Sequence, residues 1–320
     1  MNIEMIRAAQ GRLVGQARRT PLLSSPFLDD LAGRRVLVKA ECLQRTGSFK
    51  FRGAWSAISA LPDDQRARGI LAYSSGNHAQ GIAHAASLHG VPSVIVMPAD
   101  APAVKIANTR GLGGEVILYD RATEDREAIG AALAEERGLT LVKPYDEPQV
   151  IAGQGTVGLE IAEQAADLGL SQAEVLVCCG GGGLTSGVAL ALEAEAPGLR
   201  VHPCEPDGFD DVARSLAAGE RLSNPAPSGS ICDAIVTPTP GEITFPILQR
   251  LCGPGYVVSD ADCLVAMALA FERLRIVVEP GGAAALAAAL TQSQADTVIA
   301  IATGGNVDAA MFTRALETLS

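Results

Sequence analysis

The chain has 320 residues and 48% of them are hydrophobic, so it is long enough to bury the cores of two domains. Its formal net charge of −11, without a visible cluster of lysine and arginine, argues against nucleic acid as a partner. No apolar stretch reaches the roughly 18–20 uninterrupted residues of a membrane helix, because Glu272, Arg273 and Arg275 interrupt the segment 263–278.

The first predicted element is an amphipathic surface helix within residues 1–19, with Ile3, Ile6, Leu13 and Val14 on its apolar side. This segment lacks the apolar core of a signal peptide, and an arginine-rich transit peptide is the competing interpretation. The seven cysteines are odd in number and lack the CxxC spacing of metal sites. They predict buried thiols in a reducing compartment, and therefore a cytoplasmic protein.

Short runs of β-branched and apolar residues alternate with helical patterns along almost the whole chain. This alternation predicts an α/β fold with parallel sheets. Ligands of such sheets bind at the carboxyl ends of strands, so polar or glycine-rich segments that follow a strand are the candidate sites. The predicted strands cover residues 35–39, 70–73, 93–97, 116–119, 139–142, 174–179, 200–204 and 297–302.

The segment 46–54, TGSFKFRGA, contains Lys50, one of only four lysines in the chain. A buried lysine can lose its proton and form a Schiff base with a carbonyl group, whereas a guanidinium cannot. The commoner interpretation of a single lysine is a solvated side chain, here near the start of a helix that Ser48 caps.

Small polar side chains follow the predicted strand 70–73 in the sequence SSGNH, residues 74–78. They lead into a helix, so hydroxyl groups and backbone N–H groups would point at an anion such as a carboxylate or a phosphate. Taken alone, this motif favours an ordinary capped helix start.

Four successive glycines follow the strand 174–179 and open a predicted helix that extends to about Glu195. Glycines let a phosphate approach the backbone, and the N–H groups at a helix start supply positive potential. The pattern completes no G-x-G-x-x-G and no lysine follows it, although Glu205 keeps a dinucleotide site open as an alternative. Tight helix–strand packing accounts for one or two of these glycines but not for Gly180, Gly181, Gly182 and Gly183 together.

Thr303 follows the strand 297–302 and begins the sequence TGGNVD. A threonine in a turn is ordinary by itself. The chain nevertheless combines a reactive amine, a phosphate-binding loop and hydroxyl and amide groups at further strand ends. Pyridoxal phosphate is the cofactor that requires this combination.

These motifs make the chain similar to the serine/threonine dehydratase and serine racemase family, the fold type II pyridoxal-phosphate enzymes. TGSFKFRGA, SSGNHAQG, IAGQGTVGLEI, GGGGL, VVEPGGAA and GGNVD occur in the order of the family, over nearly the whole length. The resemblance implies two open, twisted, mostly parallel sheets flanked by helices. It also implies a small domain, residues 69–146, inserted into a large one formed by residues 1–68 and 147–320.

The resemblance also implies roles for individual residues. Lys50 would carry the cofactor as a Schiff base, Asn77 would bond its ring oxygen and Thr303 would face its pyridine nitrogen. Ser75 resembles the residue that acts on the opposite face of the substrate in racemases. The remaining implied cofactor contacts are Phe49, Gly180, Gly181, Gly182, Gly183 and Leu184, and the implied contacts to the substrate carboxylate are Ser74, Ser75 and His78.

The activity implied is that of an ammonia-lyase, which converts L-threonine or L-serine into a 2-oxo acid and ammonia, in a homodimer. A serine racemase and a 3-hydroxyaspartate dehydratase are alternatives within the family, and a non-catalytic phosphate or dinucleotide binder is the alternative outside it. A hydroxyaspartate needs a cation for its second carboxylate, for which Arg126 is the candidate. The chain ends soon after the last predicted helix, so we expect no appended regulatory domain.

An acidic loop after the strand 200–204 raises the question of a metal. Glu205, Asp211 and the carbonyl of Phe209 could bind Mg²⁺, with Ca²⁺ and Mn²⁺ as alternatives, because all three ions accept oxygen ligands. A solvated acidic loop is the other interpretation. In relatives Glu279 lies near the cofactor, and the other interpretation is that it only caps or positions a helix.

Two departures from the family leave the substrate side chain open: Thr303 replaces a serine, and Cys232, Asp233 and Ala234 replace Ala-Asp-Gly.

Overall fold

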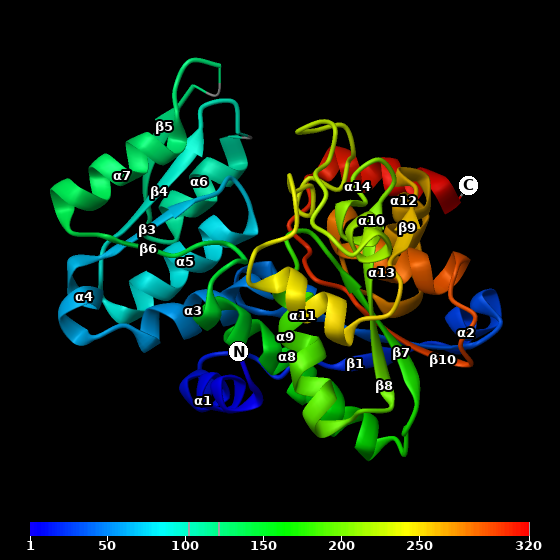
Figure 1. The fold of residues 1–320 in the computed structure, drawn as a ribbon. Coiled ribbons are helices and arrows are strands. Elements are labelled where there is room, and N and C mark those ends of the chain that lie inside the picture. The colour runs from blue at the N-terminus through cyan, green and yellow to red at the C-terminus, as the bar shows by residue number, and fades with distance from the viewer. Residues whose placement is uncertain (102, 121, 320) are drawn as a thin grey trace.

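The computed structural model describes residues 1–101, 103–120 and 122–319, which form two sheets that lie side by side, each with its own helices (Figure 1). The larger sheet is parallel except for its first strand, and the smaller one is entirely parallel. In spatial order the larger sheet contains β1 (Leu22–Ser24), β2 (Arg35–Lys39), β10 (Thr297–Ile301), β7 (Ala173–Cys178), β8 (Leu199–Pro206) and β9 (Tyr256–Val258). The smaller sheet contains β5 (Glu115–Tyr119), β4 (Ser93–Pro98), β3 (Ile70–Tyr73) and β6 (Thr140–Leu141).

Helices connect most of the parallel strands, as such sheets require. Those before the last strand of the smaller sheet are α1 (Ile3–Leu13), α2 (Pro26–Ala32), η1 (Glu41–Leu43), η2 (Arg45–Gly47), α3 (Lys50–Ala60), α4 (Asp63–Arg68), α5 (Asn77–His89), α6 (Ala103–Gly111) and α7 (Arg126–Arg137). The later ones are α8 (Pro148–Asp167), α9 (Gly183–Glu195), α10 (Asp211–Ala218), α11 (Thr244–Leu251), α12 (Asp260–Leu269), η3 (Ala270–Leu274), α13 (Pro280–Thr291), α14 (Ala309–Leu316) and η4 (Glu317–Leu319).

All eight predicted strands are present, and the predicted α/β class with two mostly parallel sheets is confirmed. The sequence did not indicate β1 and β9, which have three residues each and lie at the two edges of the larger sheet. Every strand of the smaller sheet lies within the segment 69–146, the predicted inserted domain. The predicted helix at the N-terminus is α1, but it ends at Leu13, so the expectation that Val14 belongs to its apolar side is wrong: Val14 follows the helix and is exposed. The helix that follows the four glycines ends at Glu195 as expected.

Glycines let three helices approach closely beneath the junction of the two sheets. A Cβ atom at Gly153 of α8 would lie 2.5 Å from the carbonyl oxygen of Arg52 in α3. A Cβ atom at Gly187 of α9 would lie 2.5 Å from the carbonyl oxygen of Ile151 in α8. Real Cβ atoms do not come so near to backbone, so α3, α8 and α9 form one closely packed unit only because these positions lack side chains.

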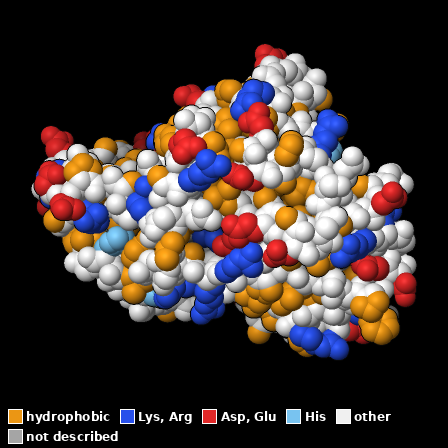
Figure 2. All heavy atoms as spheres, turned by 90° about the horizontal axis from the view of Figure 1, so that it is seen from below, with side chains coloured by type: hydrophobic (Ala, Val, Ile, Leu, Met, Phe, Trp, Pro, Cys, Tyr) orange, Lys and Arg blue, Asp and Glu red, His pale blue; other side chains and the backbone are white. Residues whose placement is uncertain are grey.

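The seven cysteines are unpaired thiols, and all except the half-buried Cys252 are buried. Acidic and basic side chains are interspersed over the face shown in Figure 2. Within the described parts of the chain, no helix has both the length and the apolar character needed to cross a bilayer.

Candidate active site

Lys50 is the first residue of α3 and lies at the wall of a cavity between the two sheets. Its Nζ atom donates a hydrogen bond to the carbonyl oxygen of Pro144 at 2.9 Å and lies 5.2 Å from the centre of the Phe49 ring. Burial lowers the pKa of Lys50 from 10.5 to about 8. At pH 7 roughly one amine in ten is then neutral, against about one in three thousand for an unperturbed lysine.

The cavity brings together all the residues predicted to contact the cofactor. It also contains side chains from the segment after β6 and from the segment 234–237, which the sequence did not assign to the cofactor. Its lining consists of Phe49, Lys50, Asn77, Tyr145, Cys178, Gly180, Gly181, Gly182, Gly183, Leu184, Thr185, Ala234, Ile235, Thr237 and Thr303.

The four glycines form a tight loop between β7 and α9. Gly182 has a φ of +90°, which residues with side chains rarely adopt. A Cβ atom at Gly181 would lie 2.2 Å from ring carbons of Tyr145, so the aromatic ring rests directly on this glycine. The loop is supported from behind by Thr244, whose Oγ1 donates to the carbonyl oxygen of Gly181 at 2.6 Å.

This loop has the donors that a phosphate needs. The first N–H groups of a helix have no partner within the helix, and those of α9 begin at Gly183, at the cavity wall. The hydroxyls of Thr185 and Thr237 are buried beside the same cavity and have no hydrogen-bond partner among the residues described. Buried hydroxyls are usually bonded, so these two donors indicate a ligand at this place. With the Lys50 amine in the same cavity, the residues fit pyridoxal phosphate.

Two residues, Glu279 and Asn306, orient the Asn77 side chain, and both belong to the part of the chain that forms the larger sheet. Its Nδ2 donates to Glu279 Oε1 at 2.6 Å, and its Oδ1 accepts from Asn306 Nδ2 at 2.7 Å. One N–H of Asn77 remains to donate to a cofactor oxygen. Glu279 is buried, and burial raises its pKa to about 7. Although Glu279 is at the start of α13, its side chain makes no cap hydrogen bond there, so its contact is to Asn77 instead.

Thr303 lies at the carboxyl end of β10, and its carbonyl oxygen accepts from the N–H of Phe49 at 3.0 Å. This bond, rather than a side-chain cap, holds the start of α3. The expectation that Ser48 caps this helix is wrong: its Oγ is buried without a partner in the described chain, and Ser48 pairs through its backbone with Gly304.

The three side chains predicted to hold the substrate carboxylate lie next to the cavity but not in its lining. Ser74 and Ser75 are half-buried in the turn before Asn77. His78 is buried, and its Nε2 lies 3.0 Å from the carbonyl oxygen of Val142, to which it donates. Burial, followed by the charge of Lys50, lowers the pKa of His78 to about 3, so the ring is neutral at physiological pH.

Tyr145 is the main cavity residue that the sequence did not reveal. It follows β6 by four residues, in a segment without a glycine or serine motif. Ligands bind at the carboxyl ends of parallel strands, so the position after β6 could have indicated it. Burial raises the pKa of Tyr145, so its phenol stays protonated at neutral pH. Arg126, the candidate for a second substrate carboxylate, is exposed at the start of α7 and outside the cavity lining, but its charge acts on this phenol.

The predicted metal ligands Glu205, Phe209 and Asp211 lie at the end of β8 and after it, outside the cavity lining. Both carboxylate oxygens of Glu205 accept backbone N–H groups, from Val212 at 2.9 Å and from Ala213 at 2.7 Å. Asp211 Oδ1 accepts from Asn224 at 2.6 Å, whereas Asp211 Oδ2 is buried and lacks a partner in the part of the chain described. Burial raises the pKa of both carboxyls, that of Asp211 to about 6. No group of three or more His, Cys, Asp and Glu side chains that could hold a metal occurs among these described residues.

The similarity of this chain to known proteins is consistent with a cavity that binds pyridoxal phosphate. The family described as "Pyridoxal-phosphate dependent enzyme" matches residues 14–304. The chain is 45% identical to an L-threo-3-hydroxyaspartate ammonia-lyase from Pseudomonas sp over 317 residues, 98% of each chain. Its structure is similar to that of maize serine racemase, with a TM-score of 0.92, 39% identity and coverage of 99% of this chain and 97% of the other. It is also similar to the threonine deaminase of T.th., with a TM-score of 0.91, 45% identity and coverage of 96% of this chain and 99% of the other.

Proposed function

The chain belongs to the family of pyridoxal-phosphate dependent enzymes, and we propose that it is an ammonia-lyase for a small β-hydroxy amino acid. The observation that carries this proposal is the presence of the Lys50 amine and the glycine loop, residues 180–183, in one cavity. A protein that only binds phosphate has no use for an amine with a lowered pKa at that place. The substrate would lose water to give an enamine, which tautomerises to an imine. Water would then hydrolyse the imine to a 2-oxo acid and ammonia, so the net loss is ammonia alone.

Different residues would bind different parts of pyridoxal phosphate. The glycine loop and the start of α9 would hold the phosphate, Asn77 would donate to the ring oxygen and Thr303 would donate to the ring nitrogen. Pyridoxal phosphate supplies an aldehyde that condenses with amines and a ring that accepts electrons from the substrate Cα. Glu279 and Asn306 leave Asn77 a single orientation, so its remaining N–H is already directed before the cofactor arrives.

Lys50 has two functions in this proposal. Its amine would hold the cofactor by condensation, and after the substrate amine has replaced it, the same amine would remove the proton from the substrate Cα. Both functions need the neutral amine, which burial provides by lowering the pKa of Lys50 to about 8. The bond to the carbonyl oxygen of Pro144 keeps the free amine at the cavity wall between these events.

Within the substrate class, we propose L-threo-3-hydroxyaspartate as the first compound to test, beside L-serine and L-threonine. The support is the 45% identity to an ammonia-lyase named for it. Arg126, which is exposed at the start of α7 and whose charge acts on the Tyr145 phenol, is the proposed cation for a second carboxylate.

The experiment is ammonia release from each amino acid, before and after borohydride treatment of the purified protein. We expect a visible absorption band that borohydride abolishes together with turnover. A colourless protein that takes up no pyridoxal phosphate would contradict the proposed activity.

Serine racemase is the second candidate, favoured by the similarity to the maize enzyme and by the half-buried position of Ser75 two residues before Asn77. Racemisation requires a proton donor on the face of the substrate opposite to the lysine. Ser75 is the predicted donor, and chiral chromatography of L-serine incubated with the protein tests this activity directly.

A divalent cation, with Mg²⁺ as the first choice, is proposed at Glu205, Asp211 and the carbonyl of Phe209. Hard oxygen ligands are those that Mg²⁺ and Ca²⁺ prefer. Support comes from the buried Oδ2 of Asp211, which has no partner in the described structure, and from the neighbouring buried carboxylates, whose repulsion a cation would relieve. The role would be structural, because none of these three residues lines the cavity.

We also propose a cytoplasmic homodimer. The support is the buried, reduced cysteines and the exposed apolar side chains on α2 and α12, where Phe27 is 60%, Leu31 58% and Val265 40% exposed. Leu31 and Val265 line the same surface groove. Light scattering of the purified protein measures the mass.

A further inference from the structure

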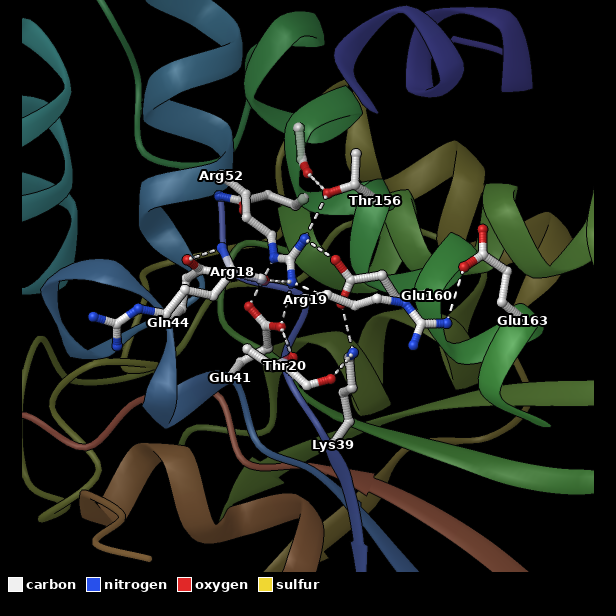
Figure 3. A network of polar contacts seen from close by, with 12 residues as sticks. Arg18, Arg19, Thr20, Lys39, Glu41, Gln44, Arg52, Thr156, Glu160 and Glu163 are labelled. Atoms are coloured by element: carbon white, nitrogen blue, oxygen red, sulfur yellow. Dashed lines mark hydrogen bonds and ion pairs between the residues drawn. The ribbon is translucent and has the colours of Figure 1, made fainter. Parts of the chain in front are cut away.

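A buried ion-pair cluster lies on the side of α3 opposite to the cavity. Arg52 follows Lys50 by two residues, and side chains two apart on a helix point in roughly opposite directions. The Arg52 side chain is 1% exposed and that of Glu41 0%. Nε and Nη2 of Arg52 donate to the two oxygens of Glu41 at 2.8 and 2.7 Å, and Nη1 donates to Glu160 at 2.7 Å (Figure 3).

The guanidinium of Arg52 has no free donor left. Besides the two carboxylates it bonds the hydroxyl of Thr156 at 3.2 Å and the backbone carbonyl of Arg18 at 3.2 Å. A planar fork with five donors fixed in this way cannot turn about its own axis. Figure 3 shows that the partners come from the N-terminal segment, from η1 and from α8, so Arg52 ties the first turn of α3 to three other segments.

Two contacts with α8 also hold this turn: the N–H of Gly53 donates to Gln154 Oε1 at 3.2 Å, and Gly153 packs against the carbonyl oxygen of Arg52. Within the described structure no side chain caps α3, and the first turn contains no acidic residue that would bind its N–H groups. The preceding turn contains Thr46 at a φ of +60°, a conformation that β-branched residues avoid. The N–H of Phe49 is bonded to the carbonyl oxygen of Thr303 just before the turn, and Arg52 is the residue of the turn whose side chain is bonded to three other segments.

We propose that Arg52 is a positioning residue for Lys50, through which Glu41 and Glu160 set the angle at which the lysine side chain enters the cavity. The two carboxylates offset the charge of the guanidinium, so the cluster adds orientation rather than positive potential at the amine. A small rotation of the first turn would move the tip of the long lysine side chain by about an ångström. A displacement of that size costs on the order of 10²-fold in rate.

The matched control is Lys39. It is also fully buried and also bonded to Glu160, at 2.6 Å, but it lies on β2 and has no part in α3. Arg52→Met and Lys39→Met each remove one buried cation from the same cluster, so they should lower the melting temperature to a similar extent.

The experiment compares both variants in three measurements: melting temperature, kcat and KM, and the rate at which the amine of the cofactor-free protein condenses with added pyridoxal phosphate, with loss of water. We expect Arg52→Met to reduce kcat and the condensation rate by roughly 10²-fold with little change in KM. A lysine at position 52 cannot form the paired hydrogen bonds of a guanidinium with Glu41 and Glu160. We therefore expect the rates of Arg52→Lys to lie between those of Arg52→Met and the wild type. Lys39→Met should change them less than about threefold.

Equal losses of kcat in the two Met variants would overturn the proposal, as would a normal condensation rate in Arg52→Met. The inference rests on Lys50 as the reactive amine, but the condensation measurement needs no substrate, so it remains decisive if the proposed substrate is wrong. Should Arg52→Met not fold, Glu41→Gln keeps the volume and one acceptor for Arg52. We expect a roughly tenfold fall in the condensation rate for this variant, and an unchanged rate refutes the proposal.

Discussion

Gly181→Ala tests the geometry of the phosphate loop most directly. A Cβ atom at this position would lie 2.2 Å from ring carbons of Tyr145, whereas carbon atoms in contact are about 3.5 Å apart. The ring or the loop must therefore move by about 1.3 Å. Overpacking of this kind costs about 1–3 kcal/mol. If the displacement occurs in the loop, the affinity for pyridoxal phosphate should fall by about 5- to 150-fold.

The assay is titration of the cofactor-free protein with pyridoxal phosphate, followed by its visible absorbance. Gly11→Ala is the matched control, because a Cβ atom there has no neighbour within 4 Å and the position lies within α1. This control should keep the wild-type affinity and gain up to about 1 kcal/mol of stability from the better helix former. The double variant Gly181→Ala with Tyr145→Ala removes the clashing ring and should recover affinity relative to Gly181→Ala alone. Wild-type affinity in Gly181→Ala, or no recovery in the double variant, would show that the ring does not confine the loop.

Three further variants test the proposed roles. Lys50→Arg should abolish both the absorption band and ammonia release, and a band in this variant would point to another lysine. In the wild-type protein without cofactor, the condensation rate should rise with pH and level off above about pH 8, because only the neutral amine reacts. Ser75→Ala should suppress interconversion of L- and D-serine more than ammonia release, and equal losses would make Ser75 a binding residue. Chelation should lower the melting temperature of the wild type and Mg²⁺ should restore it, whereas Asp211→Ala should respond to neither; an unresponsive wild type would leave Asp211 in a solvated acidic loop.

The strands were predictable because parallel strands buried on both faces are nearly continuous apolar runs. β7 and β10 show this pattern, with Val175, Leu176, Val298 and Ile299 fully buried. β1 and β9 are short edge strands that contribute three residues each, too few to show any period. Their existence depends on β2 and β8, whose free edges they cover. Local sequence carries no sign of such dependence.

The grouping of the glycines, Lys50 and Thr303 around one cavity was predictable for a different reason, because each belongs to a local motif, whereas their roles toward the cofactor stay predictions. The surroundings were not predictable, because they arise where separate segments meet. The sequence predicted Ser48 as the helix cap, but the carbonyl oxygen of Thr303, which follows β10, accepts the hydrogen bond at the start of α3 instead. Tyr145 contacts Gly181 only because the segment after β6 returns to the larger sheet, and no local sequence pattern predicts this contact.

The cavity also bears on how this chain could be recombined with its relatives. Residues 69–146 contain Asn77 of the cavity lining and Ser74 and Ser75 next to it, whereas Lys50 and the glycine loop come from outside this segment. A chimaera that takes this segment from another member would exchange the predicted substrate side and retain the phosphate side. The second crossover would decide its success: placed after residue 146, it imports a foreign side chain opposite Gly181, and placed before residue 145, it keeps the native Tyr145 ring against the native loop.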